Sequence, residues 1–191
     1  MAKAVESTPI KKKSRFGKKA KGFIGWIIQI VLVVILSAVV AYGFFGTVIM
    51  QESSMEPTIH TNDHIRINRA SYLFGSPERE DIIAFYKSDS RTGSIQVKRI
   101  IGLPGDTVQI KDGLILINGE TYMESGEFTK INNPGLASDP ITLGKDEYFV
   151  LGDNRNNSED SRFIDMGNIK EENIIGKAWV ITSPWSRFGF L

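Results

Sequence analysis

The sequence predicts a mainly β protein, in which a single N-terminal transmembrane helix precedes an antiparallel β-sheet or barrel domain with a looped insertion. Two observations support this fold class. Beyond about residue 50, short runs of β-branched and aromatic residues alternate with Gly, Pro, Asn and Asp, a pattern typical of antiparallel strands and not of βαβ units. Ahead of them, residues 22–51 contain no charged side chain.

Residues 1–21 are predicted to be a basic cytoplasmic tail. The segment contains a single acidic residue, Glu6, against the basic residues Lys3, Lys11, Lys12, Lys13, Arg15, Lys18, Lys19 and Lys21. With little apolar surface to bury, the tail is expected to be unfolded or to lie along a membrane surface. A nucleic-acid-binding arm is the alternative.

Residues 22–48 are predicted to form the transmembrane helix, because the apolar run can cross a bilayer core of about 30 Å. Trp26 and Tyr42 lie near its ends, where amphipathic rings favour the membrane interface. A cleavable signal peptide would be shorter and end in small residues, whereas this run continues into Phe44 and Phe45. The basic tail would keep the N-terminus in the cytoplasm. The chain is therefore expected to cross the plasma membrane once.

Residues 49–191 are predicted to form one extracytoplasmic domain with its own core. Its expected strands cover residues 64–68, 81–86, 96–101, 107–111, 114–118, 147–151 and 174–181. Asp112-Gly113 and Asn118-Gly119 are turn signals between strands. Residues 120–146 are less periodic and contain two proline turns, so they are expected to be a looped insertion.

Composition excludes several kinds of site. The formal net charge of +1 gives the whole chain no bias towards nucleic acid, and the absence of cysteine excludes disulfides, thiolate metal sites and a cysteine nucleophile. The only histidines, His60 and His64, lie on a loop-to-strand segment and not on one helix face, which does not favour a metal site. No metal or organic cofactor is expected.

Ser54 follows the apolar run, in the segment Ser53-Ser54-Met55-Glu56-Pro57-Thr58. Pro57 fixes its own φ and disfavours helical geometry before it, so the serine is expected on a stiff turn. On these residues alone, a structural turn is the simpler interpretation. A catalytic serine needs a base, and a Ser-His-Asp triad would require one of the two histidines, of which His64 is predicted to face solvent.

The remaining candidate base is Lys98, which lies within an apolar, β-branched strand. Burial would lower the pKa of its ammonium and supply a neutral amine, although an edge-strand lysine facing solvent is the alternative. Further along, residues 152–162 are dense in Asp, Asn, Ser and Arg, which can hold an irregular loop in one shape. A solvated loop or a calcium site is the alternative, but the spacing is not that of an EF-hand and Arg155 and Arg162 oppose a cation.

Together these segments resemble the bacterial type I signal peptidases, in the short single-anchor form of Gram-positive bacteria. The matching segments are residues 54–58, 80–85, 97–106 and 152–162. The resemblance implies that Ser54 is the nucleophile and Lys98 the general base of a Ser-Lys dyad. It also implies that Ser158 hydrogen-bonds and orients the lysine amine. Three further residues would brace the site: Asp153, Asp160 and Arg162.

Glu52 departs from the family pattern. Two residues before the nucleophile, Gram-negative relatives have a serine that helps form the oxyanion hole, and Gram-positive relatives usually have glycine. A carboxylate would oppose a developing oxyanion, so the Glu52 side chain is expected to point away. The backbone N–H of Ser54 is then the expected oxyanion donor, with the Ser53 hydroxyl as a weaker candidate.

The resemblance implies a membrane-anchored serine endopeptidase that removes signal peptides from exported preproteins during protein secretion. Its expected partners are those preproteins and the lipid bilayer, with no nucleic acid and no metal. Two alternatives remain: a catalytically weak or silent relative that binds exported segments, and a self-cleaving Ser-Lys repressor, which would need a DNA-binding domain in place of the apolar run. Residues 72–74 and 185–191 are expected either to touch the membrane or to pack against the domain.

Overall fold

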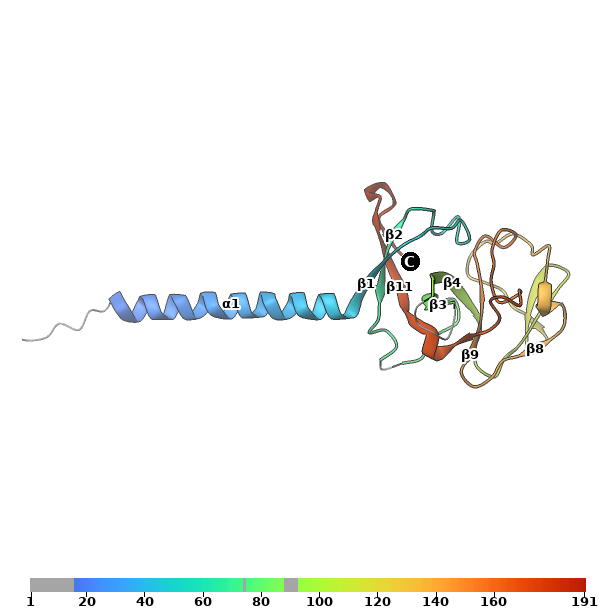
Figure 1. The fold of residues 1–191 in the computed structure, drawn as a ribbon, viewed down its shortest axis with the longest axis horizontal. Coiled ribbons are helices and arrows are strands. Elements are labelled where there is room, and N and C mark those ends of the chain that lie inside the picture. Colours follow the sequence, from blue (N-terminus) through green and yellow to red (C-terminus); the bar gives the residue numbers. More distant parts are fainter. Residues whose placement is uncertain (1–15, 74, 88–92) are drawn as a thin grey trace, which may run out of the picture. The chain divides into compact units, whose positions relative to one another are not determined.

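The computed structural model describes residues 16–73, 75–87 and 93–191, and the chain divides into two compact units, Met1–Gly43 and Phe44–Leu191. The described part of the first unit is residues 16–43, which belong to the helix α1 (Phe16–Phe44) (Figure 1). Among the described residues, no helix combines the length and the apolar character needed to cross a membrane. Residues 1–15 of the predicted tail lie outside the described part of the chain.

The predicted helix boundary at residue 48 is wrong, because residues 45–49 form the strand β1 (Phe45–Ile49). Every residue of β1 has an antiparallel partner in β2 (His64–Asn68). Thr47, Val48 and Ile49 are β-branched residues, which fit a pleated strand better than a helix. Backbone pairing with β2 therefore ends the helix four residues earlier than apolar character alone predicts.

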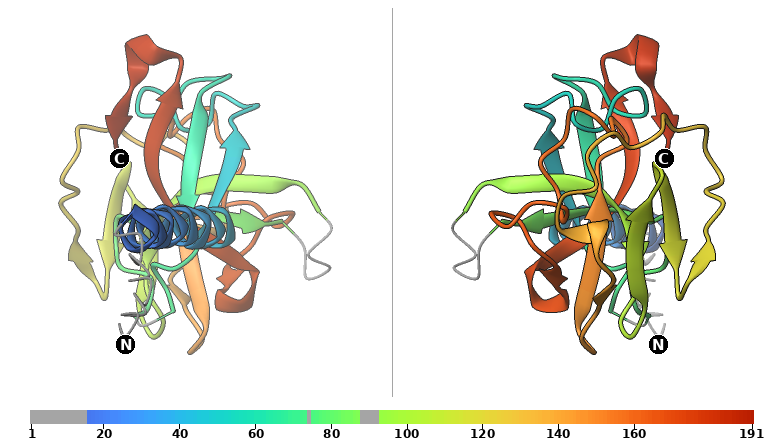
Figure 2. Two further views of the ribbon diagram at one scale, coloured as in Figure 1. Left: turned by 90° about the vertical axis from the view of Figure 1, so that its left-hand side faces the viewer. Right: turned by 90° about the vertical axis from the view of Figure 1, so that its right-hand side faces the viewer.

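The second unit contains two antiparallel sheets (Figures 1 and 2). The larger has eight strands in the order β1-β2-β11-β3-β4-β9-β10, with β12 paired to β11. Its further strands are β3 (Ile82–Tyr86), β4 (Ile95–Gly102), β9 (Glu147–Leu151), β10 (Ile169–Lys170), β11 (Ile174–Ser183) and β12 (Gly189–Phe190). Figure 1 shows β1, β2 and β11 at one end of this unit and β8 at the other.

The smaller sheet has four strands in the order β7-β6-β5-β8. They are β5 (Thr107–Lys111), β6 (Leu114–Ile117), β7 (Glu120–Thr121) and β8 (Ile141–Thr142). The connections that the structure describes contain three short 3-10 helices: η1 (Gly135–Ser138), η2 (Glu171–Asn173) and η3 (Trp185–Arg187). Most of residues 120–146 is irregular, but β8 pairs with β5, which ties the end of the predicted insertion to this sheet.

The mainly β, antiparallel architecture is confirmed, and each predicted strand is present to within two residues. The strands that were not predicted are β1 and the two-residue strands β7, β8, β10 and β12. Two residues are too few to show an alternating pattern, so these short strands leave no signal in the sequence. Residues 171–173 form η2, which ends at the residue directly before β11.

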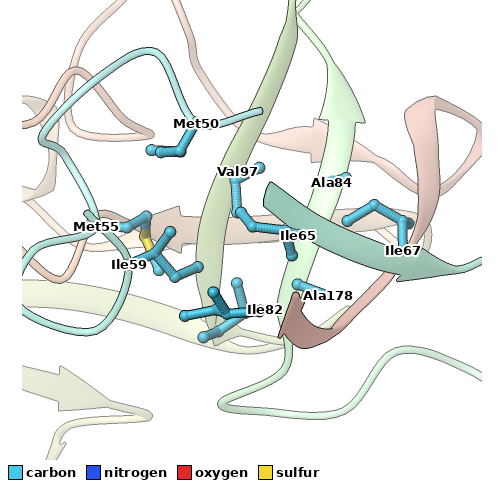
Figure 3. Close-up of a cluster of buried hydrophobic side chains, with 10 residues drawn as sticks. Met50, Met55, Ile59, Ile65, Ile67, Ile82, Ala84, Val97 and Ala178 are labelled. Atoms are coloured by element: carbon cyan, nitrogen blue, oxygen red, sulfur yellow. The ribbon is translucent and has the colours of Figure 1, made fainter. Parts of the chain in front are cut away.

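A cluster of buried side chains under the larger sheet fixes the segment that contains Ser54 (Figure 3). Met55 and Ile59 are fully buried, and Met50 is 4% exposed. They pack with side chains from β2, β3, β4 and β11, among them Ile65, Ile82, Val97 and Ala178. Because apolar anchors lie on both sides of Ser54, burial of about 1.5–3 kcal/mol per large side chain holds this turn against the sheet.

Candidate active site

The structure brings Ser54 and Lys98 together, although 44 residues separate them. Lys98 Nζ donates a hydrogen bond of 2.6 Å to Ser54 Oγ. Ser54 is 3% exposed and Lys98 is fully buried. Lys98 lies near the middle of β4, where it is the antiparallel partner of Ile83 in β3. The solvent-facing alternative for Lys98 is therefore wrong, and the pair has the geometry of a nucleophile beside a base.

Backbone hydrogen bonds close the turn on which Ser54 lies. Met50 N–H donates to Asp63 O at 2.9 Å, and Asn62 N–H donates to Met50 O at 2.7 Å. Ile59 N–H donates to the carbonyl oxygen of Met55 at 2.9 Å. Met50 is thus paired with the two residues just before β2, which closes the base of the segment that carries Ser54, and the bond between Ile59 and Met55 orders the segment after Ser54.

Burial lowers the pKa of the Lys98 ammonium below its ordinary value, because an apolar surrounding disfavours the charged form. The negative charges of Glu52, Asp160 and Glu159 act in the opposite direction and raise it. A lysine amine with a lowered pKa can be neutral near physiological pH, and only the neutral amine can accept a proton from a serine hydroxyl.

The Glu52 side chain does not point away from the dyad, so that expectation is wrong. Glu52 Oε2 lies 3.6 Å from Lys98 Nζ, and the Glu52 side chain is 51% exposed. A lysine ammonium attracts a nearby carboxylate, although water around the half-exposed Glu52 side chain screens part of this attraction. This attraction accounts for the position of the Glu52 side chain better than repulsion from an oxyanion that is not yet formed.

The loop of residues 152–162 holds the serine turn through two asparagines. Asn154 N–H donates to Ser54 O at 3.0 Å, and Asn154 Nδ2 donates to Ser53 O at 3.1 Å. Asn157 Nδ2 donates to Ser53 Oγ at 3.0 Å. The sequence offered both asparagines as candidate oxygen ligands of the alternative calcium site, and it did not predict their contact with the serine turn.

Asp153 joins three segments that are distant in the sequence. Its fully buried carboxylate accepts a hydrogen bond of 2.5 Å from Thr58 Oγ1, in the serine turn. It also accepts bonds of 2.8 and 2.7 Å from Arg99 Nε and Nη2, next to Lys98 in β4. A bidentate Arg–carboxylate pair fixes the relative orientation of its partners. Sequence analysis missed Thr58 and Arg99 as members of this arrangement.

Asp160 and Arg162 form a second buried ion pair within the same loop. Arg162 Nε and Nη2 donate to the Asp160 carboxylate at 2.7 and 2.8 Å. Asp160 Oδ2 also accepts a hydrogen bond of 3.1 Å from the backbone N–H of Gly152, and Arg162 Nη1 donates to Asn133 O at 3.2 Å. The pair therefore links both ends of the loop to each other and to the insertion.

Ser158 does not make its expected contact. Its Oγ is buried, and no hydrogen-bond partner for it is found among the residues that the structure describes. The Lys98 amine instead lies against Ser54 Oγ and the Glu52 carboxylate. Ser158 is nevertheless close to the nucleophile, since a Cβ placed on Gly152 would lie 2.2 Å from Ser158 Oγ and 2.5 Å from Ser54 O.

Two open cavities meet at Gln51 and Glu52. The first, of about 590 Å³, is lined by residues 47–52 along β1 and residues 94–97 along β4. In the described pairings, β1 pairs only with β2, and residues 95–98 of β4 pair only with β3, so each strand offers a free edge here. The second cavity, of about 810 Å³, contains Ser54 in its wall, together with residues 156–159.

Comparison with known proteins identifies relatives of this chain. A family model described as "Signal peptidase, peptidase S26" matches residues 23–183. A signal peptidase I of Leptolyngbya laminosa is 40% identical over 148 residues, which are 72% of this chain and 68% of the relative. Signal peptidase I P of Bacillus subtilis subsp. natto is 34% identical over 179 residues, covering 89% of this chain and 94% of the relative.

A crystal structure of a signal peptidase I from Enterococcus faecalis V583 matches 53% of this chain and 96% of its own chain, at 33% identity and a TM-score of 0.41. The family match extends from within α1 to the end of β11. It therefore includes the serine turn, β4 and the loop of residues 152–162. The chain accordingly belongs to the signal peptidases of family S26 and is a signal peptidase, a hydrolase.

Proposed function

We propose that the chain is a membrane-anchored serine endopeptidase that removes signal peptides from exported preproteins with a Ser54–Lys98 dyad. The observation that carries this proposal is the 2.6 Å hydrogen bond between Lys98 Nζ and Ser54 Oγ in a buried setting. An exposed lysine would be charged at neutral pH and could not act as a base. Family membership supports the substrate class, and the contact supports the roles of the two residues.

In the proposed reaction, neutral Lys98 takes the proton of Ser54 as Oγ attacks the scissile carbonyl carbon. The resulting oxyanion accepts a hydrogen bond from the backbone N–H of Ser54. Lys98 then returns the proton to the leaving amine, which becomes the N-terminus of the mature protein, and the signal peptide stays on Ser54 as an ester. Lys98 next deprotonates a water that attacks the ester, and it gives this proton to Ser54 Oγ as the signal peptide leaves with a free carboxylate.

The first cavity supports binding of the substrate as an extended strand. A peptide can add to a free sheet edge through main-chain hydrogen bonds, and free edges of β1 and β4 border this cavity. The cavity adjoins Glu52, two residues from the nucleophile. We assign it to the residues before the scissile bond, which the family resemblance implies are small and alanine-like at the first and third positions.

The proposed bilayer anchor is the part of the predicted segment 22–48 that lies in α1, residues 22–44, which contain no charged side chain. Large apolar side chains along α1 are exposed, among them Leu32, Val33 and Leu36, and a helix that is apolar all round suits lipid. The proposed orientation keeps the N-terminus in the cytoplasm and the second unit outside. Sharing a membrane with a bound signal peptide would raise the effective substrate concentration.

An aromatic surface on the second unit supports membrane contact. It consists of Phe45, Trp179, Trp185, Phe188 and Phe190. Phe45, the residue after α1, stacks on Trp179 with ring centroids 5.3 Å apart, and Trp179 meets Phe190 at 5.7 Å. Trp185 is 82% exposed and Phe190 is 71% exposed. Exposed aromatic rings favour the lipid–water interface, so we propose that this surface rests on the bilayer.

The test is a cleavage assay on a signal-bearing preprotein in detergent, with N-terminal sequencing of the product. The full chain should cut once, after a small residue, whereas Ser54→Ala and Lys98→Ala should bind the preprotein and leave it intact. Binding without cleavage by the unaltered chain would instead identify a catalytically silent relative. Full activity in either variant would refute the dyad.

A further inference from the structure

We propose that Glu52 is a positioning residue for the general base, whose carboxylate holds the Lys98 amine in the free enzyme and thereby sets the pH range of the peptidase. A substrate peptide releases this hold when it binds. The inference deepens the proposed Ser54–Lys98 function and rests on it. The acidic side chain lies where the family resemblance implies serine or glycine.

The geometry places Glu52 on the same amine that contacts the nucleophile. Glu52 Oε2 is 3.6 Å from Lys98 Nζ, and Ser54 Oγ is 2.6 Å from it. The lysine side chain is fully buried, whereas the Glu52 side chain is half exposed. Glu52 can therefore move into solvent without disturbing the core, but Lys98 cannot follow it.

The other charged groups around Lys98 already have partners. Asp160 is paired with Arg162 at 2.7 Å, and Glu159 on the same loop is paired with Lys87 at 3.1 Å. Two further ion pairs belong to the neighbouring strands: Asp153 with Arg99, which follows Lys98 in β4, and Asp81 before β3 with Lys177 in β11. Glu52 is thus the carboxylate that lies within ion-pair distance of Lys98 among the described residues.

The Glu52 carboxylate favours the protonated form of Lys98, which cannot act as a base. A negative charge this close favours the ammonium form, whereas burial of the lysine favours the neutral amine. Because the Glu52 side chain is half exposed, water screens the attraction and reduces it well below its value in a dry interior. The remaining effect of Glu52 is to raise the pKa of the Lys98 ammonium, opposite to the effect of burial.

The cavities connect Glu52 to substrate binding. Glu52 lines both the cavity along β1 and β4 and the cavity that contains Ser54. A peptide that runs from one cavity to the other across the nucleophile must pass this side chain. The bound peptide would displace the flexible carboxylate from Lys98 and leave the amine in contact with Ser54. The interaction between the Glu52 carboxylate and the Lys98 amine is therefore a property of the free enzyme and is weaker in the substrate complex.

The test compares full-length Glu52→Gln with the unaltered chain over a range of pH, using a signal-bearing preprotein in detergent. The acid limb of kcat/KM reports on the free enzyme and that of kcat on the substrate complex. We expect the kcat/KM limb of Glu52→Gln to move to lower pH by about one unit, which is a gain of about tenfold below the limb and none above it. The kcat limb should move less. Glu120→Gln, in exposed β7, removes the same charge elsewhere and should shift neither limb. The kcat/KM limb of Glu52→Asp should lie between those of the unaltered chain and Glu52→Gln.

A second readout separates this inference from the proposed function. The Lys98 amine can be titrated by NMR in the full chain labelled with 13C at lysine Cε, with its signal assigned through Lys98→Ala. A lower titration midpoint in Glu52→Gln supports the inference, even if Ser54→Ala proves to retain activity and the dyad is abandoned. An unchanged Lys98 midpoint in an active Glu52→Gln enzyme would overturn the inference. A loss of activity that is uniform over pH, or an equal shift of both limbs, would also contradict it.

Discussion

Replacing Gly152 with alanine should impair catalysis without touching either dyad residue. The added Cβ would lie 2.2 Å from Ser158 Oγ and 2.5 Å from the carbonyl oxygen of Ser54. Ordinary contacts at a Cβ begin near 3.4 Å, so the loop and the serine turn must separate by roughly 1 Å, which is the scale at which misplaced catalytic groups lose about 100-fold in rate. The backbone of Ser54 must share this movement, because its carbonyl oxygen is one of the two obstacles.

The assay measures kcat with a saturating preprotein, and urea unfolding of the same sample measures stability. We expect Gly152→Ala to lose about 100-fold in kcat and about 1–3 kcal/mol in free energy of unfolding, the usual cost of overpacking. Gly75→Ala is the matched control, since nothing lies within 4 Å of the added Cβ there. A folded Gly152→Ala enzyme with kcat within threefold of the unaltered chain would refute the close packing of this loop against the serine turn.

Three further predictions concern charge and surface. Burial lowers the pKa of Lys98, and the neutral amine is the base. The kcat/KM should therefore rise with pH and level off below the ordinary lysine pKa of about 10.4. A kcat/KM that keeps rising up to that pH would contradict a buried base. Asp153→Ala leaves the largely buried Arg99 guanidinium without its carboxylate partner. Urea unfolding should show a loss of about 3–5 kcal/mol in the free energy of unfolding. A loss below about 1 kcal/mol would show that Asp153 does not stabilise the site. The double variant Trp185→Ser, Phe190→Ser should weaken vesicle binding by residues 44–191 about tenfold or more. Met123 is as exposed as Trp185, at 82%, and Met123→Ser should leave vesicle binding unchanged. Equal effects of the two changes would show that the aromatic surface is not the membrane contact.

Much of the larger sheet could be predicted, because its strands are long enough to show their pattern. β2 alternates buried Ile65 and Ile67 with more exposed neighbours, and the β-branched run around Lys98 predicts burial of both faces of β4. Pairing between strands is set by contacts distant in the sequence, so the order of the strands was not predicted. The end of α1 was missed for the same reason, since it depends on pairing of β1 with β2.

The dyad could be proposed from the sequence only through the family resemblance. Nothing local to Ser54 or Lys98 indicates that they meet, because the fold closes the distance between them. The contacts of single side chains were harder still. Glu52 lies towards the lysine and Ser158 lacks the expected hydrogen bond, because the position of a side chain depends on the balance of all neighbouring charges and not on its place in a motif.

The central claim is that Ser54 is the nucleophile, and the kcat/KM of Ser54→Ala with a signal-bearing preprotein tests it most directly. Ser53→Ala is the matched control, because the Ser53 hydroxyl makes only the 3.0 Å contact with Asn157 among the described side-chain hydrogen bonds. We predict a loss of about 10⁴-fold or more for Ser54→Ala, the scale seen when a serine nucleophile is removed, and a loss of less than about tenfold for Ser53→Ala. A Ser54→Ala enzyme that keeps a tenth or more of the activity would contradict the account.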